Sequence, residues 1–400
     1  MLEKYTEDIF KIASLPETRQ SALERFSKGT NLSGDERTAL KTYLLSEIVL
    51  RDLQMLKEGN YYFDEFTAKK RNIGGKERLI FSLPFEQKTI IRLINYGILL
   101  RYSAQFSKDL YSFKIGGNQY KSLESIRSCS NFKDLYLFKT DIKSYGRSIV
   151  EKEMCHLLDS FFAQDIELCA FLKWYVKRNT YYLDDVLYED APVTKDGLSF
   201  SGLFENIYLT DLDSLMEKEA DYYSRFGDDI LIGAANREKL DELIGKTKNI
   251  FDKKGLTMHP MKTSIIFPGE RFEHLGVIVE GSSIDLSEDY LAYIERRIRK
   301  RARKLAILQR KKRLPKEIVL FRMIQWIETL KSDIEITQRY SFITTDKSLK
   351  KIDRMLTDLI RGAAAGTTGR KKYQVSYKEL SKWGYKSLVR EYYEAISCKK

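Results

Sequence analysis

The sequence has 400 residues with 43% hydrophobic content, enough to bury a large core and to form two or three domains. No run of about 18 apolar residues occurs, so we expect no membrane span, and the first residues lack the basic-then-apolar pattern of a signal peptide. Four cysteines without CxxC spacing and three histidines argue against a zinc site and fit the reducing conditions of a cytoplasm.

The formal net charge of +12 indicates a polyanionic partner. The charge is concentrated between Leu291 and Arg313, where eleven residues are Lys or Arg and only Glu295 is acidic. Apolar residues recur at helical spacing in this stretch, at Ile294, Ile298, Leu305 and Leu308. A solvated helix face is the alternative, but such faces usually mix both signs. We therefore expect a helix that follows a phosphate backbone.

Taken in chain order, the first 57 residues are predicted to be helical. Residues 61–80 are predicted to form two strands joined by Gly74–Gly75. The hairpin cations Lys70, Arg71, Lys76 and Arg78 would suit the dispersed charge of a triphosphate, although basic hairpins are also common as sheet edges. An amphipathic helix is predicted from Pro84 to about Ser103, and a short strand at Tyr111–Lys114.

Residues 135–142 are almost continuously apolar and are predicted to form a buried strand that ends at Asp141. Helical sequence follows over 148–178, and then a short hairpin over 181–189. A loop rich in Gly and Ser is predicted to precede a long helix from Leu203 to about Tyr223, with Ser201 as its N-cap.

Apolar residues flank Asp228 and Asp229, and Gly227 precedes them, which predicts a strand, a tight turn and a strand with both carboxylates at the tip. Adjacent ionised carboxylates are costly in a half-buried hairpin unless a cation lies between them. A solvated turn is the simpler interpretation of an isolated Asp pair. A helix over 238–254, a strand over 272–278 and a basic helical region beyond about Leu286 complete the predicted elements.

Five segments, in this order, resemble the palm motifs of reverse transcriptases. They are Thr140–Tyr145, Gly197–Ser201 with Asn206–Leu209, Phe226–Asp229, Gly255–Thr257 with Lys262, and Phe272–Gly276. The resemblance covers about residues 60–285 and is greatest to the single-domain bacterial enzymes of retrons, abortive infection and phage defence.

The resemblance implies an α+β polymerase with a right-hand fold. Residues 1–57 would be a helical extension and 58–135 the fingers. The palm, with a ferredoxin-like antiparallel sheet, would span 136–285 with a helical insert at 148–190. An all-helical thumb would follow at 286–400.

The resemblance also implies a chemistry. Two Mg²⁺ ions, or Mn²⁺ in their place, would be held by Asp141 and Asp228, with Asp229 as a weaker third ligand and the Ile142 carbonyl on the nucleotide side. Lys262 would protonate the pyrophosphate, an exposed lysine being the alternative. The residues implied at the nucleotide are Lys70, Arg71, Lys76, Arg78, Tyr145, Gly146, Asp196, Gly197 and Ser201. Those implied at primer and template are His274, Leu275, Gly276, Arg296, Arg299, Lys300 and Arg303.

Three positions depart from the family pattern. Gly146 stands where an aromatic residue usually blocks a ribose 2′-hydroxyl, so either Tyr145 supplies that wall or sugar discrimination is relaxed. Lys195–Asp196 replaces the usual Pro-Gln, and Gly227 is a residue also typical of RNA-dependent RNA polymerases.

The leading hypothesis is a cytoplasmic RNA-directed DNA polymerase of bacterial anti-phage defence. Its substrates would be dNTPs, its product DNA, and its partner an RNA template or an associated non-coding RNA. A second hypothesis is a template-independent or protein-primed nucleotidyltransferase that accepts ribonucleotides. A third is an inactive nucleic-acid-binding scaffold. A partner protein or a homo-oligomer is left open.

Overall fold

The computed structural model describes residues 8–28, 32–73, 75–312, 315–365 and 369–397, without the side chains of 305–312 and 316. Gly74 of the predicted hairpin and Arg313 of the predicted basic helix lie outside this range, as do the side chains of Leu305 and Leu308. The chain divides into two compact units. The first unit is Met1–Asn118 with Tyr136–Ile265, and the second is Gln119–Leu135 with Ile266–Lys400.

The first unit contains a long helix, α5, whose side chains are buried on several faces because other helices pack around it. Helix α1 packs against α5 at Gly97, where an added Cβ would make ordinary contact with Ile9 Cγ2 at 3.5 Å. The helices of this region are α1 (Ile9–Ser14), α2 (Pro16–Ser27), α3 (Gly34–Leu44), α4 (Glu47–Lys57), α5 (Phe85–Tyr102), α8 (Glu151–Phe161) and α9 (Ile166–Lys177). The predicted helical N-terminal region and the helix from Pro84 are confirmed within the described residues.

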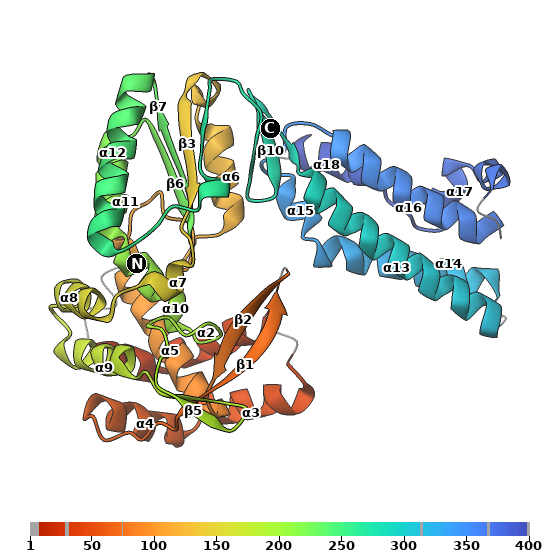
Figure 1. Ribbon diagram of the computed structural model, residues 1–400. Coiled ribbons are helices and arrows are strands. Elements are labelled where there is room, and N and C mark those ends of the chain that lie inside the picture. The colour runs from red at the N-terminus through yellow and green to blue at the C-terminus, as the bar shows by residue number, and fades with distance from the viewer. Residues whose placement is uncertain (1–7, 29–31, 74, 313–314, 366–368, 398–400) are drawn as a thin grey trace. The chain divides into compact units, whose positions relative to one another are not determined.

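One sheet of the first unit has the strand order β2-β1-β4-β5. Its strands are β1 (Phe66–Ile73), β2 (Lys76–Ser82), β4 (Tyr181–Leu183) and β5 (Val186–Tyr188). The basic hairpin β1–β2 is antiparallel, and β1 pairs in parallel with β4, so both predicted hairpins share one sheet. This sheet lies in the lower part of Figure 1.

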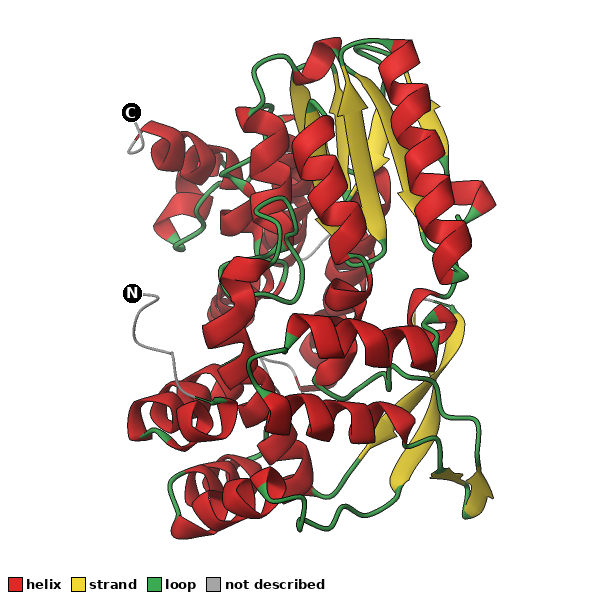
Figure 2. Cartoon of the chain, turned by 90° about the vertical axis from the view of Figure 1, so that its left-hand side faces the viewer, coloured by secondary structure: helices red, strands yellow, loops and turns green. Residues whose placement is uncertain are grey.

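The other sheet of the first unit has the order β6-β7-β3-β8. Its strands are β3 (Tyr136–Asp141), β6 (Tyr222–Phe226), β7 (Asp229–Ala234) and β8 (Ser264–Ile266). Helices α11 (Thr210–Glu219) and α12 (Arg237–Lys254) cover one face of it (Figures 1 and 2). The central strand β7 is buried from Ile230 to Ala234, which explains its continuous apolar sequence.

The second unit has a small antiparallel sheet and a group of helices. The sheet contains β9 (Phe272–His274), β10 (Val277–Glu280) and β11 (Ser283–Leu286). The helices are α6 (Gln119–Ser128), α13 (Glu288–Lys312), α14 (Lys316–Asp333), α15 (Ile336–Arg339), α16 (Lys347–Ala365), α17 (Tyr377–Lys382) and α18 (Leu388–Ser397). Asp353 of α16 accepts hydrogen bonds from the Tyr385 hydroxyl and the Leu388 N–H, which ties the start of α18 to α16. In the described part of the chain after β11, the long elements are all helices, as predicted.

Four local predictions are wrong. Tyr111–Lys114 is a bend, because Phe113 has a left-handed φ of 48°, and only the neighbouring Leu110 forms a bridge, with Arg225. The helix predicted from Leu203 to Tyr223 is interrupted at Leu209 and ends at Glu219. It consists of α10 (Phe200–Tyr208) and α11, and the aromatic residues that follow belong to β6.

Ser201 also differs from its predicted role, because α10 begins at Phe200 and Ser201 lies inside the helix. Its hydroxyl donates instead to the Lys195 carbonyl at 2.8 Å. Residues 272–278 are not one strand, since Leu275 and Gly276 have positive φ angles and reverse the chain between β9 and β10.

The predicted division into extension, fingers, palm and thumb stays a prediction. The compact units do not follow its boundaries, because 119–135 and 266–285 group with the C-terminal helices. Among the residues that the structure describes, no helix combines the length and the apolar character that crossing a bilayer requires.

Candidate active site

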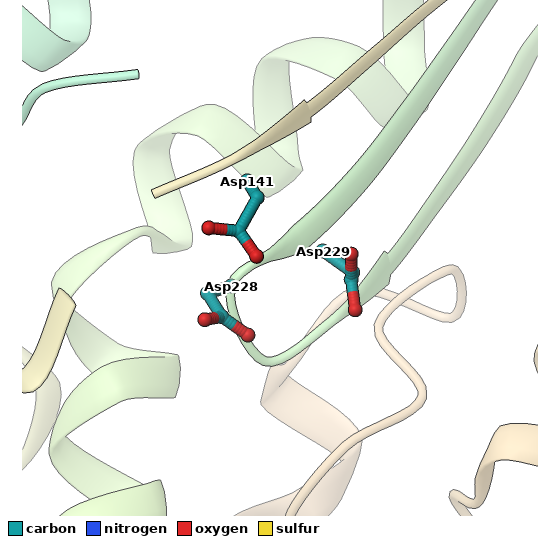
Figure 3. A group of neighbouring side chains, drawn as sticks. All are labelled: Asp141, Asp228 and Asp229. Atoms are coloured by element: carbon teal, nitrogen blue, oxygen red, sulfur yellow. The ribbon is translucent and has the colours of Figure 1, made fainter. Parts of the chain in front are cut away.

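Three carboxylates from two separate stretches of sequence meet at one end of the sheet β6-β7-β3-β8 (Figure 3). Asp141 is the last residue of β3 and lies directly opposite Asp229, the first residue of β7. Asp228 stands in the two-residue turn between β6 and β7, where Gly227 has a φ of 66°. One oxygen from each carboxylate lies within 4.8 Å of the other two. The predicted convergence of these residues is confirmed.

Backbone hydrogen bonds fix the relative position of the three residues. The Ile142 N–H donates to the Asp228 carbonyl at 3.3 Å, which ties the end of β3 to the turn. On the other side, the His259 N–H donates to the Asp141 carbonyl at 2.7 Å, and Lys143 donates to Thr257 at 2.9 Å. Main-chain hydrogen bonds on both sides therefore fix the backbone positions from which the carboxylates project.

The electrostatics of the cluster favour a bound cation. Burial, and then the charges of Asp228 and Asp141, raise the pKa of Asp229 to about 6. Burial and the charge of Asp141 likewise raise the pKa of Asp228. Like charges directly opposite each other on paired strands are destabilising. A divalent cation would remove this cost, and an all-carboxylate donor set suits Mg²⁺ or Mn²⁺.

Lys262 lies next to the cluster, on the short turn Pro260–Lys262, and its Nζ donates to Asp141 Oδ2. Burial alone would lower the pKa of Lys262, but the hydrogen bond to Asp141 and the charges of all three carboxylates raise it. The side chain is half exposed. Lys262 is thus a cation beside the carboxylates that is accessible to a ligand.

A buried polar network is hydrogen-bonded to the turn, and it was not predicted from the sequence. Arg225 of β6 is fully buried, and its guanidinium donates to both Asp213 oxygens, at 2.7 and 2.6 Å, and to the Gly227 carbonyl at 3.2 Å. Tyr223 donates to the same carboxylate at 2.7 Å. The Gly227 N–H donates to Ser112 Oγ at 2.8 Å. The N–H and the carbonyl of Gly227 are therefore both hydrogen-bonded to this network. An Arg inside a strand rich in aromatic residues was the available signal, because a buried charge requires a partner.

The predicted triphosphate ligands lie on β1–β2 with exposed side chains. Arg71 and Arg78 are cross-strand neighbours, and Lys70 pairs with Glu77 at 3.5 Å. Arg78 also lies 4.0 Å from Asp196. Lys76, at the start of β2, is exposed.

The loop that contains Asp196 packs against β2. The Phe81 N–H donates to the Asp196 carbonyl at 2.7 Å. Gly197 has a φ of 98°, and an added Cβ would lie 2.7 Å from the Phe81 carbonyl oxygen, so only glycine permits this approach. The structure thus brings Arg78, Asp196 and Gly197 together.

The predicted primer and template residues belong to the second unit. His274 is buried, and Leu275 with Gly276 forms the turn between β9 and β10. Arg296, Arg299, Lys300 and Arg303 are exposed along α13. Their contacts with nucleic acid stay predictions, as does the role of the Ile142 carbonyl.

A comparison with protein families agrees with this site. A sequence profile of the family described as reverse transcriptase (RNA-dependent DNA polymerase) matches residues 68–279. The profile covers more than half of the chain and contains all three carboxylates. A search of curated proteins finds no match.

Solved structures that the search matches to this chain include telomerases of two Candida species. The apo telomerase of Candida tropicalis is 15% identical with a TM-score of 0.47, covering 81% of this chain and 60% of that one. A form of the same telomerase truncated from its C-terminal domain is 15% identical with a TM-score of 0.45, covering 56% and 55%. Candida albicans telomerase in complex with a fragment of telomeric RNA is 11% identical with a TM-score of 0.47, covering 86% and 68%. The chain thus spans 55 to 68% of the length of these telomerases. On the strength of the family match, the chain belongs to the reverse transcriptase (RNA-dependent DNA polymerase) family.

Proposed function

We propose that this protein is an RNA-directed DNA polymerase that adds deoxynucleotides to a 3′-hydroxyl. The observation that carries the proposal is the convergence of Asp141, Asp228 and Asp229, with one oxygen of each within 4.8 Å of the others. Two Mg²⁺ ions, or Mn²⁺ ions, would activate the hydroxyl and neutralise the charge that develops on the phosphate oxygens when bound. Asp141 and Asp228 would contact both ions, and Asp229 would be the weaker ligand.

Other residues of the first unit would bind and orient the nucleotide. The exposed cations of β1–β2, above all Arg78 with Lys76 and Arg71 or Lys70, would hold the triphosphate. Lys262 stays protonated beside Asp141 and would donate its proton to the leaving pyrophosphate. Along α13, the exposed basic side chains would contact the phosphates of primer and template.

For the biological setting, we propose bacterial anti-phage defence, in the cytoplasm, with an associated non-coding RNA as template. Support comes from the resemblance of the motifs to the single-domain bacterial enzymes. Sequencing the nucleic acid that co-purifies with the protein tests this point: a defined structured RNA joined to complementary DNA supports it, and a random sample of cellular RNA contradicts it.

Primer extension tests the activity. Wild-type protein with Mg²⁺, an RNA template, a DNA primer and labelled dNTPs should extend the primer, and Asp228→Asn should reduce extension at least about 1,000-fold. Asp241→Asn is the matched control, because Asp241 is a half-exposed carboxylate on α12 that pairs with Arg237. Full activity in Asp228→Asn would refute the proposed mechanism.

A further inference from the structure

Gly146 marks a position where the chain has no room for a side chain. It follows β3 in the short helix α7 (Tyr145–Ser148). An added Cβ would lie 2.3 Å from Thr194 Oγ1 and 3.3 Å from Glu205 Oε1. Real Cβ atoms do not approach other atoms to 2.3 Å, so even alanine would displace Thr194. The volume that a larger residue would occupy is already filled by Thr194 and Glu205.

Tyr145 does not provide a substitute wall at this place. Its side chain is buried, and its hydroxyl donates to the Glu205 carbonyl at 2.5 Å. Tyr145 therefore lies beneath α10 and fixes the backbone that carries Glu205. Thr194 is itself buried at 2% exposure, so it is held in place by its surroundings. Glu205 is partly exposed and remains in reach of a ligand.

Charges from both the carboxylate cluster and the predicted nucleotide-binding residues act on Glu205. Burial, and then the charges of Asp228 and Asp196, raise the pKa of its carboxyl to about 8. Arg78, which lies 4.0 Å from Asp196, acts through space on both Glu205 and Asp228. The resemblance implies that the sugar of the incoming nucleotide lies beside Gly146, and Glu205 Oε1 lies near that position. A neutral carboxyl there would not repel the triphosphate.

We propose that Glu205, supported by Thr194, is the wall that excludes a ribose 2′-hydroxyl from the nucleotide site. The Glu205 side chain occupies the space beside Gly146. A ribose 2′-hydroxyl could therefore enter only by displacing this side chain or by giving up its own hydrating water. The role of this glycine is then to make room for the wall, and the protein selects deoxynucleotides. This inference rests on the proposed polymerase function and names the residues that set its sugar specificity.

Single-nucleotide incorporation of dATP and ATP opposite the same template base tests the inference. The kcat/KM ratio of dATP to ATP should fall about 10-fold or more in Glu205→Ala, mainly through a gain with ATP. Glu205→Gln keeps the shape of the side chain and should stay within about 3-fold of the wild-type ratio. Thr194→Ala should shift the ratio in the same direction as Glu205→Ala, because Glu205 loses a neighbour. Retained dATP incorporation shows that each variant is folded.

Two results would overturn the inference: equal use of ATP and dATP by the wild type, or an unchanged ratio in Glu205→Ala. Measurement of dATP and ATP binding by calorimetry in the presence of Ca²⁺ is a second test, and it does not depend on turnover. If the wild type fails to extend any primer, the proposed function fails. Even then, stronger ATP binding by Glu205→Ala than by wild type would support the wall, and unchanged ATP binding would refute it.

Discussion

Removal of the Asp213 carboxylate should strongly destabilise the first unit. Arg225 is fully buried, and Asp213 is its partner at 2.6 Å. Asp213→Ala leaves a guanidinium charge in the core without its counter-ion, and breaking a buried pair in this way costs about 3–5 kcal/mol. For a unit of this size, that corresponds to a fall in Tm of about 6–20 °C. Because Arg225 also donates to the Gly227 carbonyl, primer extension should fall as well.

Differential scanning fluorimetry and urea unfolding provide the assay. Asp241→Ala is the matched control, because its ion pair with Arg237 has a similar distance, 2.9 Å, but lies on the surface. It should change Tm by less than about 2 °C. The double variant Asp213→Leu/Arg225→Met should recover much of the loss, since a buried ion pair can be replaced by apolar side chains of similar volume. A Tm of Asp213→Ala within about 2 °C of wild type would refute the reasoning.

Three further predictions concern a packed glycine, a buried lysine and the basic helix. Gly202→Ala should lower the free energy of unfolding in urea by about 1–3 kcal/mol, because an added Cβ would lie 2.3 Å from Phe113 Cγ. Gly245→Ala is the control and should be neutral or stabilising, because an added Cβ would have nothing within 4 Å. Equal effects of the two substitutions would contradict this prediction. Burial, and then the charge of Arg178, lower the pKa of Lys195 to about 7. Between pH 7 and about 10.5 the unfolded chain therefore binds more protons than the folded protein, so the free energy of unfolding should rise with pH across that window. Lys195→Met should therefore raise Tm most near pH 7 and progressively less towards pH 10, and a gain independent of pH would contradict the shifted pKa. The double variant Lys300→Ala/Arg303→Ala should reduce the slope of log K against log salt concentration for RNA binding by about 2. Lys350→Ala should change this slope little, because the ammonium group of Lys350 pairs with Asp346. An unchanged slope in the double variant would contradict the role of α13.

Local patterns predicted the elements that carry the carboxylates. The short apolar run before Asp141 indicated a buried strand, and Gly227 with flanking apolar residues indicated the hairpin that presents Asp228. Their meeting required the register of β3 on β7, which no local pattern encodes. The order of the family-like segments supplied that information.

Features that depend on long-range contacts were missed. The bend at Phe113 forms because Ser112 bonds to Gly227 and Tyr111 to Arg225, both more than 100 residues away. The helix is interrupted at Leu209, which is fully buried, and neither Gly nor Pro stands at this point to signal the break in the sequence. Thr194 belongs to none of the motifs found in the sequence. Its part in the proposed wall follows only from its close approach to Gly146.

The most direct test of the central claim is anomalous diffraction from crystals of the protein grown with Mn²⁺, primer–template and a non-hydrolysable dNTP. We predict two Mn²⁺ peaks about 3.5–4 Å apart, both in contact with Asp141 and Asp228. Manganese bound elsewhere, with these carboxylates uncoordinated in the presence of the nucleotide, would contradict the account.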